Sequence, residues 1–120
     1  MPHSTIALLM LNSLKEKISQ NMFTLEARVN MRFDEAAYED LVACLQALAT
    51  ELASARQIDK ELALCLYTIP QAIQNLYLSL ARCEIRPPIT DRLEEACIEL
   101  DALVIECLSG NPARHLSAQP

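Results

Sequence analysis

Few side chains in this 120-residue sequence have the types and spacing that catalysis needs. The two histidines, His3 and His115, lie near the two ends of the sequence, outside every segment with helical periodicity. A di-iron bundle needs Glu-x-x-His on two helices, and a nucleophile needs a neighbouring base. Neither arrangement occurs in the sequence. We therefore expect a protein that is not an enzyme and has no catalytic residues.

Paired carboxylates also fail to indicate acid–base chemistry. Glu94 and Glu95 are adjacent, and two further pairs, Glu35/Glu39 and Glu99/Glu106, fall on helical faces opposite apolar residues. Such a position is typical of a solvated helix face. We expect these carboxylates to be surface groups.

Five cysteines are the remaining reactive groups: Cys44, Cys65, Cys83, Cys97 and Cys107. Their number is odd and they form no Cys-x-x-Cys pair, so neither a zinc site nor a disulfide framework is indicated. On one helix, Cys65 and Cys83 would lie about 27 Å apart, too far for one metal or one disulfide. A pair between helices, such as Cys44 with Cys97, and a soft-metal site stay open. We favour reduced, buried core thiols in a cytoplasmic protein, with no metal and no cofactor.

Composition and charge limit the partners of the protein. The net charge is −6, with most of the negative charge in residues 34–61 and 91–109, and there is no basic stripe. Nucleic-acid binding and attachment to an anionic membrane are therefore not expected. The hydrophobic fraction is 52% and glycine occurs once, a composition that favours an all-α fold.

Apolar residues recur at helical spacing over four segments, which must position any site. The first helix is expected from about Thr5 to Asn30, with Leu25 and Val29 among its inner residues and Phe23 on its far side. Asp34 and Asp59 are expected to cap the second and third helices, and Thr90 and Asp91 to begin the fourth. Short connections predict an up-down-up-down four-helix bundle in residues 1–110, with residues 111–120 as a flexible C-terminal tail.

The third expected helix contains the stretch from Leu62 to Ala81, which has no charged side chain. Polar residues within it, such as Gln71 and Asn75, argue against a membrane span. Pro70 is expected to kink this helix without ending it. The inner face is apolar, and the opposite face carries what we call the outer stripe: Leu64, Tyr67, Gln71, Asn75, Leu78 and Arg82.

The outer stripe has two interpretations. It is either covered within the monomer or exposed as an interface, and we take its six residues as the interaction site of a homodimer. A similar question arises for the outer side of the fourth helix, with Ile98, Ala102 and Ile105 between acidic residues.

We therefore predict a non-catalytic helical-bundle interaction module that self-associates through the outer face of its third helix. One alternative is a small acidic inhibitor or immunity-type protein that binds a basic partner. Another is a carrier of an apolar small molecule, with a pocket where Pro70 kinks the helix, beside Tyr67 and Tyr77. A further protein partner, not identified by the sequence, is compatible with each of them.

Overall fold

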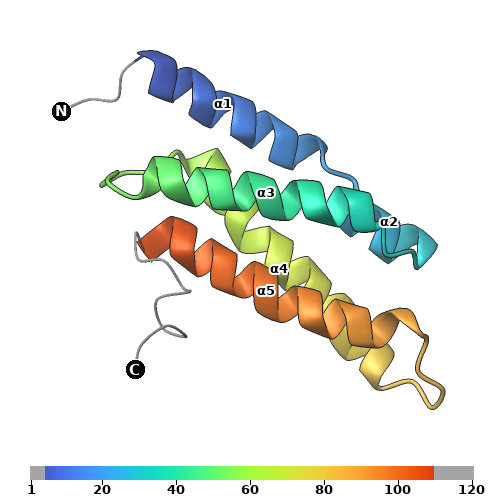
Figure 1. Ribbon diagram of the computed structural model, residues 1–120. Coiled ribbons are helices and arrows are strands. Elements are labelled where there is room, and N and C mark those ends of the chain that lie inside the picture. Colours follow the sequence, from blue (N-terminus) through green and yellow to red (C-terminus); the bar gives the residue numbers. More distant parts are fainter. Residues whose placement is uncertain (1–4, 110–120) are drawn as a thin grey trace, which may run out of the picture.

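The computed structural model describes residues 5–109 and contains five α-helices in this range. They are α1 (Thr5–Gln20), α2 (Phe23–Asn30), α3 (Glu35–Leu52), α4 (Lys60–Ala81) and α5 (Ile89–Ser109) (Figure 1). No strand occurs between residues 5 and 109, so the all-helical prediction is confirmed there. A four-helix bundle fits the arrangement, with α1 and α2 together taking the place of the first expected helix. The expected tail at residues 111–120 lies outside the described residues.

The first expected helix is divided in two, because α1 ends at Gln20 and α2 begins at Phe23. Asn21 accounts for the break. Its side-chain amide donates a hydrogen bond to the carbonyl of Ala37 on α3 (2.9 Å), and its Oδ1 accepts one from the backbone N–H of Phe23 (2.9 Å). Asparagine side chains compete with helical backbone hydrogen bonds in this way. The prediction of one uninterrupted helix is therefore wrong.

The break also changes which residues of this segment are buried. The ring of Phe23 is fully buried, with its centroid 4.9 Å from the ring centroids of both Phe33 and Tyr38. Leu25 and Val29 are exposed instead. A two-residue interruption rotates α2 relative to α1, so the expected inner and outer positions of these residues are exchanged.

The core lies where α3, α4 and α5 meet, and α2 covers it. Side chains from all five helices form one continuous cluster, whose largest fully buried apolar members are Phe23, Leu41, Leu45, Leu48, Leu66, Ile73, Leu93 and Leu100. Burying a leucine or isoleucine side chain stabilises the fold by about 1.5–3 kcal/mol. Every fourth or third position of α3, α4 and α5 contributes to this cluster, as the sequence periodicity predicts.

Both predicted aspartate caps are present. The Oδ1 of Asp34 accepts a hydrogen bond from the N–H of Ala37 at the start of α3 (3.1 Å), and the Oδ2 of Asp59 accepts one from the N–H of Leu62 on α4 (3.0 Å). These bonds satisfy N–H groups that have no partner within the helix. From this cap α4 runs as one helix through Pro70.

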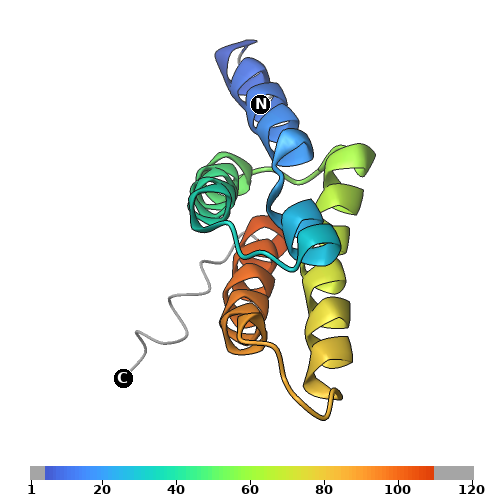
Figure 2. The same cartoon turned by 90° about the vertical axis from the view of Figure 1, so that its right-hand side faces the viewer.

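α1 packs unevenly along its length. Ile18 is buried and Leu11 and Leu14 are half-buried, whereas Ile6 and Leu9 at the other end are exposed. Figure 2 shows the N-terminal part of α1 extending away from the other helices. The first two turns of α1 thus carry apolar side chains that the described part of the chain does not cover.

Candidate association surface

The outer stripe is exposed along the whole length of α4. All six of its residues are exposed: Leu64, Tyr67, Gln71, Asn75, Leu78 and Arg82. Leu64 is 63% exposed and Tyr67 is 61% exposed, large values for apolar and aromatic side chains. Within residues 5–109, no other helix covers this stripe.

The polar middle of the outer stripe adjoins α2. A cavity of about 400 Å³ is lined by Arg28 of α2 and by Thr68, Gln71, Ala72, Asn75 and Leu76 of α4. The two amides of the stripe, Gln71 and Asn75, thus face a shallow groove. Pro70, Tyr67 and Tyr77 do not line this groove.

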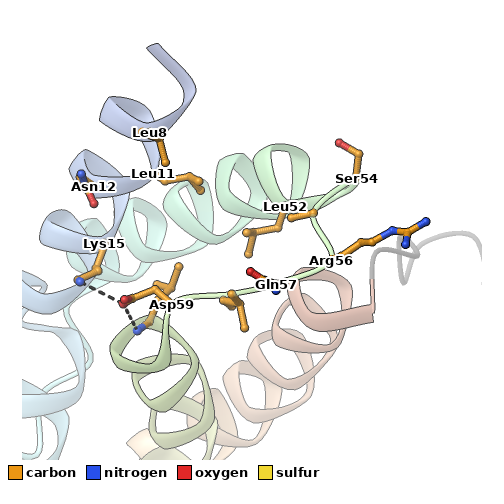
Figure 3. Close-up of a pocket in the computed structure, with 12 residues that line it drawn as sticks. Leu8, Leu11, Asn12, Lys15, Leu52, Ser54, Arg56, Gln57 and Asp59 are labelled. Atoms are coloured by element: carbon orange, nitrogen blue, oxygen red, sulfur yellow. Dashed lines mark hydrogen bonds and ion pairs between the residues drawn. The ribbon is translucent and has the colours of Figure 1, made fainter. Parts of the chain in front are cut away.

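A larger cavity, of about 820 Å³, lies between α1 and the connection from α3 to α4. Figure 3 shows Leu8 and Leu11 of α1 facing this connection, with Leu52 of α3 on the other side. The Nζ of Lys15 lies 3.1 Å from the Oδ2 of Asp59 at the edge of the cavity. No sequence pattern indicated this cavity, because it depends on the angle between α1 and α3.

The outer side of α5 is also exposed. Ile98 is 70% exposed and Ile105 is 50% exposed, and Ala102 between them is half-buried. Glu94, Glu95 and Asp101 are exposed around them. In contrast to the outer stripe of α4, this face is both apolar and strongly acidic.

The predicted surface carboxylates differ in their surroundings. Glu35 is held by Arg92, and Tyr38 donates a hydrogen bond from its Oη to Glu99. The Oη of Tyr77 donates one to Glu94 (3.0 Å). Glu106 is buried, so the expectation that it belongs to a solvated face is wrong. In residues 5–109 no group of three or more Cys, Asp, Glu or His side chains has an arrangement that could hold a metal ion.

The five thiols are free, and their burial varies. Cys107 is buried and its Sγ donates a hydrogen bond to the carbonyl of Leu45 (3.4 Å). Burial raises the pKa of the Cys107 thiol to about 12 and that of Cys97 to about 11. Cys44 and Cys65 are half-buried, and Cys83 is exposed. Of the five thiols predicted to be buried, Cys107 is fully buried, and Cys97 is half-buried like Cys44 and Cys65. The prediction is wrong for Cys83, which lies beyond the last buried turn of α4.

No protein-family model, curated protein sequence or solved structure matches this chain. Among the described helices, none has both the length and the apolar character needed to cross a membrane. The two histidines, His3 and His115, fall outside the described residues.

Proposed function

We propose that this protein is a non-catalytic helical-bundle interaction module that forms a homodimer through the outer stripe of α4. The observation that carries this proposal is an exposed helix face that is rich in apolar and amide groups and contains one charged residue, Arg82. Carboxylates and ammonium groups are costly to desolvate at an interface, whereas amides can exchange hydrogen bonds with a partner. Tyrosine and arginine are also among the residues that contribute most to binding energy at interfaces.

The spacing of the outer stripe is symmetric. From Leu64 to Leu78 its residues are separated by three, four, four and three positions, with Gln71 at the centre. A two-fold axis brings the same surface of both subunits together, so that residue i meets residue j and j meets i. A stripe that is symmetric about its own centre suits this kind of contact.

An antiparallel pair of α4 helices with its axis at Gln71 gives a specific set of contacts. Leu64 of one copy faces Leu78 of the other, Tyr67 faces Asn75, and the two Gln71 side chains face each other. Apolar groups then meet apolar groups at both ends. The amide of Asn75 and the hydroxyl of Tyr67 can form a hydrogen bond across the axis, as can the two Gln71 amides. Each exposed group of the stripe from Leu64 to Leu78 obtains a chemically suitable partner.

Three further features belong to this proposal. The helical segments alternate in direction as an up-down-up-down bundle, and Pro70 kinks α4 next to the central Gln71 by removing one backbone hydrogen bond. The protein acts in the cytoplasm, where its free thiols remain reduced. The short connections between the helices support the alternating topology.

Cross-linking at the centre of the stripe tests the proposal. Gln71→Cys, in a Cys83→Ser background that removes the exposed native thiol, places two cysteines at the axis. We expect an interchain disulfide on mild oxidation, since facing residues near an axis meet the short Cα–Cα distance that a disulfide needs. Gln46→Cys, at an exposed position on α3, is the matched control and should stay monomeric under denaturing electrophoresis. Equal cross-linking of the two variants would contradict the proposal.

A second candidate function is transport of an apolar small molecule, and the cavity beside α1 favours it. Its volume of about 820 Å³ lies in the range of about 300–1,000 Å³ that is typical of small-molecule sites. Leu8, Leu11, Leu52 and Leu62 contribute its apolar wall. An apolar dye whose fluorescence increases on binding tests this function. Loss of the increase in Leu11→Glu, but not in Leu64→Glu, would support transport in addition to dimer formation.

A further inference from the structure

The charged residues are divided unevenly along the sequence. α3 and α5, which pack against each other, carry ten carboxylates and one cation, Arg92. The remainder of the sequence carries nine cations and six carboxylates. The negative charge of the protein is therefore concentrated on one pair of helices, and α4 between Leu62 and Ala81 has none.

The outer face of α5 lies within this acidic pair and presents two isoleucines. Ile98 and Ile105 are separated by seven residues, so they lie on one line about 10.5 Å apart along the helix. Glu94 and Asp101 lie to one side of this line and Glu95 lies to the other, by their helical positions. We call Glu94, Glu95, Ile98, Asp101 and Ile105 the acidic stripe.

Contacts within the chain neutralise only part of this charge. Arg92 lies 3.4 Å from Glu95, whose side chain is nevertheless largely exposed, and its other ion pair is with Glu35. Glu94 accepts its hydrogen bond from a neutral phenol, that of Tyr77. Asp101 has no ion pair with any described residue. Glu94 and Asp101 also contribute, after burial, to the raised pKa of the Cys97 thiol, which indicates a negative local potential.

This charge makes a second copy of the chain an unsuitable partner for α5. A two-fold contact through the acidic stripe would bring Glu94, Glu95 and Asp101 against the same three residues of the other copy. Like charges opposed at an interface cost several kcal/mol. Nucleic acids and anionic membranes are repelled for the same reason. The partner of this face must carry positive charge.

We propose that the acidic stripe of α5 binds a basic amphipathic helix of another protein. An amphipathic helix presents apolar side chains at positions i, i+3, i+4 and i+7, and this spacing matches the line from Ile98 to Ile105. Lysine and arginine on both flanks of such a helix face Glu94, Glu95 and Asp101. The site is independent of the outer stripe of α4, so the proposal does not rest on the proposed dimer.

Titration with a designed peptide tests this assignment. The probe is an 18-residue fluorescein-labelled peptide of leucine and lysine, with leucine at helical i, i+3, i+4 and i+7 positions and lysine elsewhere. A peptide of identical composition in scrambled order, which cannot form an apolar face, is the first control. We expect fluorescence anisotropy to show saturable binding of the amphipathic peptide and binding of the scrambled peptide that is weaker by about tenfold or more.

Variants of the protein locate the site. Ile98→Ser with Ile105→Ser should weaken binding by about tenfold or more, because the apolar anchors are lost while all charges remain. Ile85→Ser is the matched control, since Ile85 is 86% exposed but lies outside α5, and it should bind as the wild type does. Glu94→Gln with Asp101→Asn should weaken binding and reduce its dependence on salt. Leu64→Glu with Leu78→Glu, which targets α4, should leave peptide binding unchanged.

Three results would overturn the proposal. They are equal binding of the scrambled and amphipathic peptides, unchanged affinity in the Ile98/Ile105 variant, and no binding of either peptide by the wild type. Melting curves followed by circular dichroism verify that each variant is folded. Because Ile98 and Ile105 are exposed, their replacement should not lower the melting temperature appreciably.

Discussion

The guanidinium of Arg92 on α5 is joined to the carboxylate of Glu35 on α3 by two hydrogen bonds, of 3.0 and 2.9 Å. The same guanidinium lies 4.5 Å from the centroid of the Phe33 ring. One side chain therefore connects the start of α3 to α5 through an ion pair and a cation–π contact. It is also the one cation on the two acidic helices.

Replacing Glu35 should show a pH-dependent loss of stability. Hydrogen bonding to Arg92 lowers the pKa of the Glu35 carboxyl from its ordinary value of 4.5. A carboxyl with a lowered pKa stabilises the fold at pH values above its ordinary pKa. This contribution to stability is lost as the pH falls through the lowered pKa. Glu35→Gln should therefore melt at a lower temperature than the wild type at pH 7, with the difference shrinking below about pH 4.5. Melting curves of both proteins at a series of pH values measure this difference in melting temperature. A difference that does not change with pH would contradict the prediction.

The thiols should react in an order set by their burial. Cys83 is exposed, whereas Cys107 is buried, donates a hydrogen bond to Leu45 and has a pKa raised to about 12. Because the thiolate is the reactive form, Cys83 should react first with a chromogenic disulfide at pH 8 and Cys107 last. Mass spectrometry of partly modified protein identifies the sites. Modification of Cys107 in the folded protein at the rate of Cys83 would show that the end of α5 is more open than described.

Thr90→Val should stabilise the protein. Thr90 is 1% exposed, and its Oγ1 has no hydrogen-bond partner among the described residues. An unsatisfied buried hydroxyl is costly, and valine has almost the same shape without the polar atom. We expect a gain of about 1 kcal/mol in the free energy of unfolding, measured by denaturation with urea. A loss of stability instead would indicate that the hydroxyl has a partner outside the described residues.

The sequence was sufficient to predict the helices that are determined by local signals. Apolar residues at every third or fourth position located α3, α4 and α5, and Asp34 and Asp59 marked the starts of two of them, because a cap is a local interaction. The exposed face of α4 was recognisable as a stripe, although periodicity alone left open whether another helix covered it. Only the packing of the other helices decides that question.

The break between α1 and α2 was not predictable from periodicity, because it depends on tertiary contacts. Asn21 ends α1 by bonding to Ala37, which lies sixteen residues away on another helix. Met31 ends α2 in the left-handed conformation, with φ of 53°, a role more often filled by glycine. Neither the break at Asn21 nor the end of α2 at Met31 has a strong sequence signal.

The oligomeric state of two charge variants tests the proposed dimer most directly. Leu64 and Leu78 are about 21 Å apart on one helix, too far to pair within a subunit. In the antiparallel dimer, Leu64 of each copy faces Leu78 of the other copy. Leu64→Glu with Leu78→Glu opposes like charges at both ends of the interface, whereas Leu64→Lys with Leu78→Glu opposes opposite charges there. By sedimentation equilibrium, with melting curves to verify folding, we predict a wild-type dimer, a folded monomer for the Glu/Glu variant and a dimer for the Lys/Glu variant. A monomeric wild type, or the same oligomeric state for both charge variants, would contradict the account.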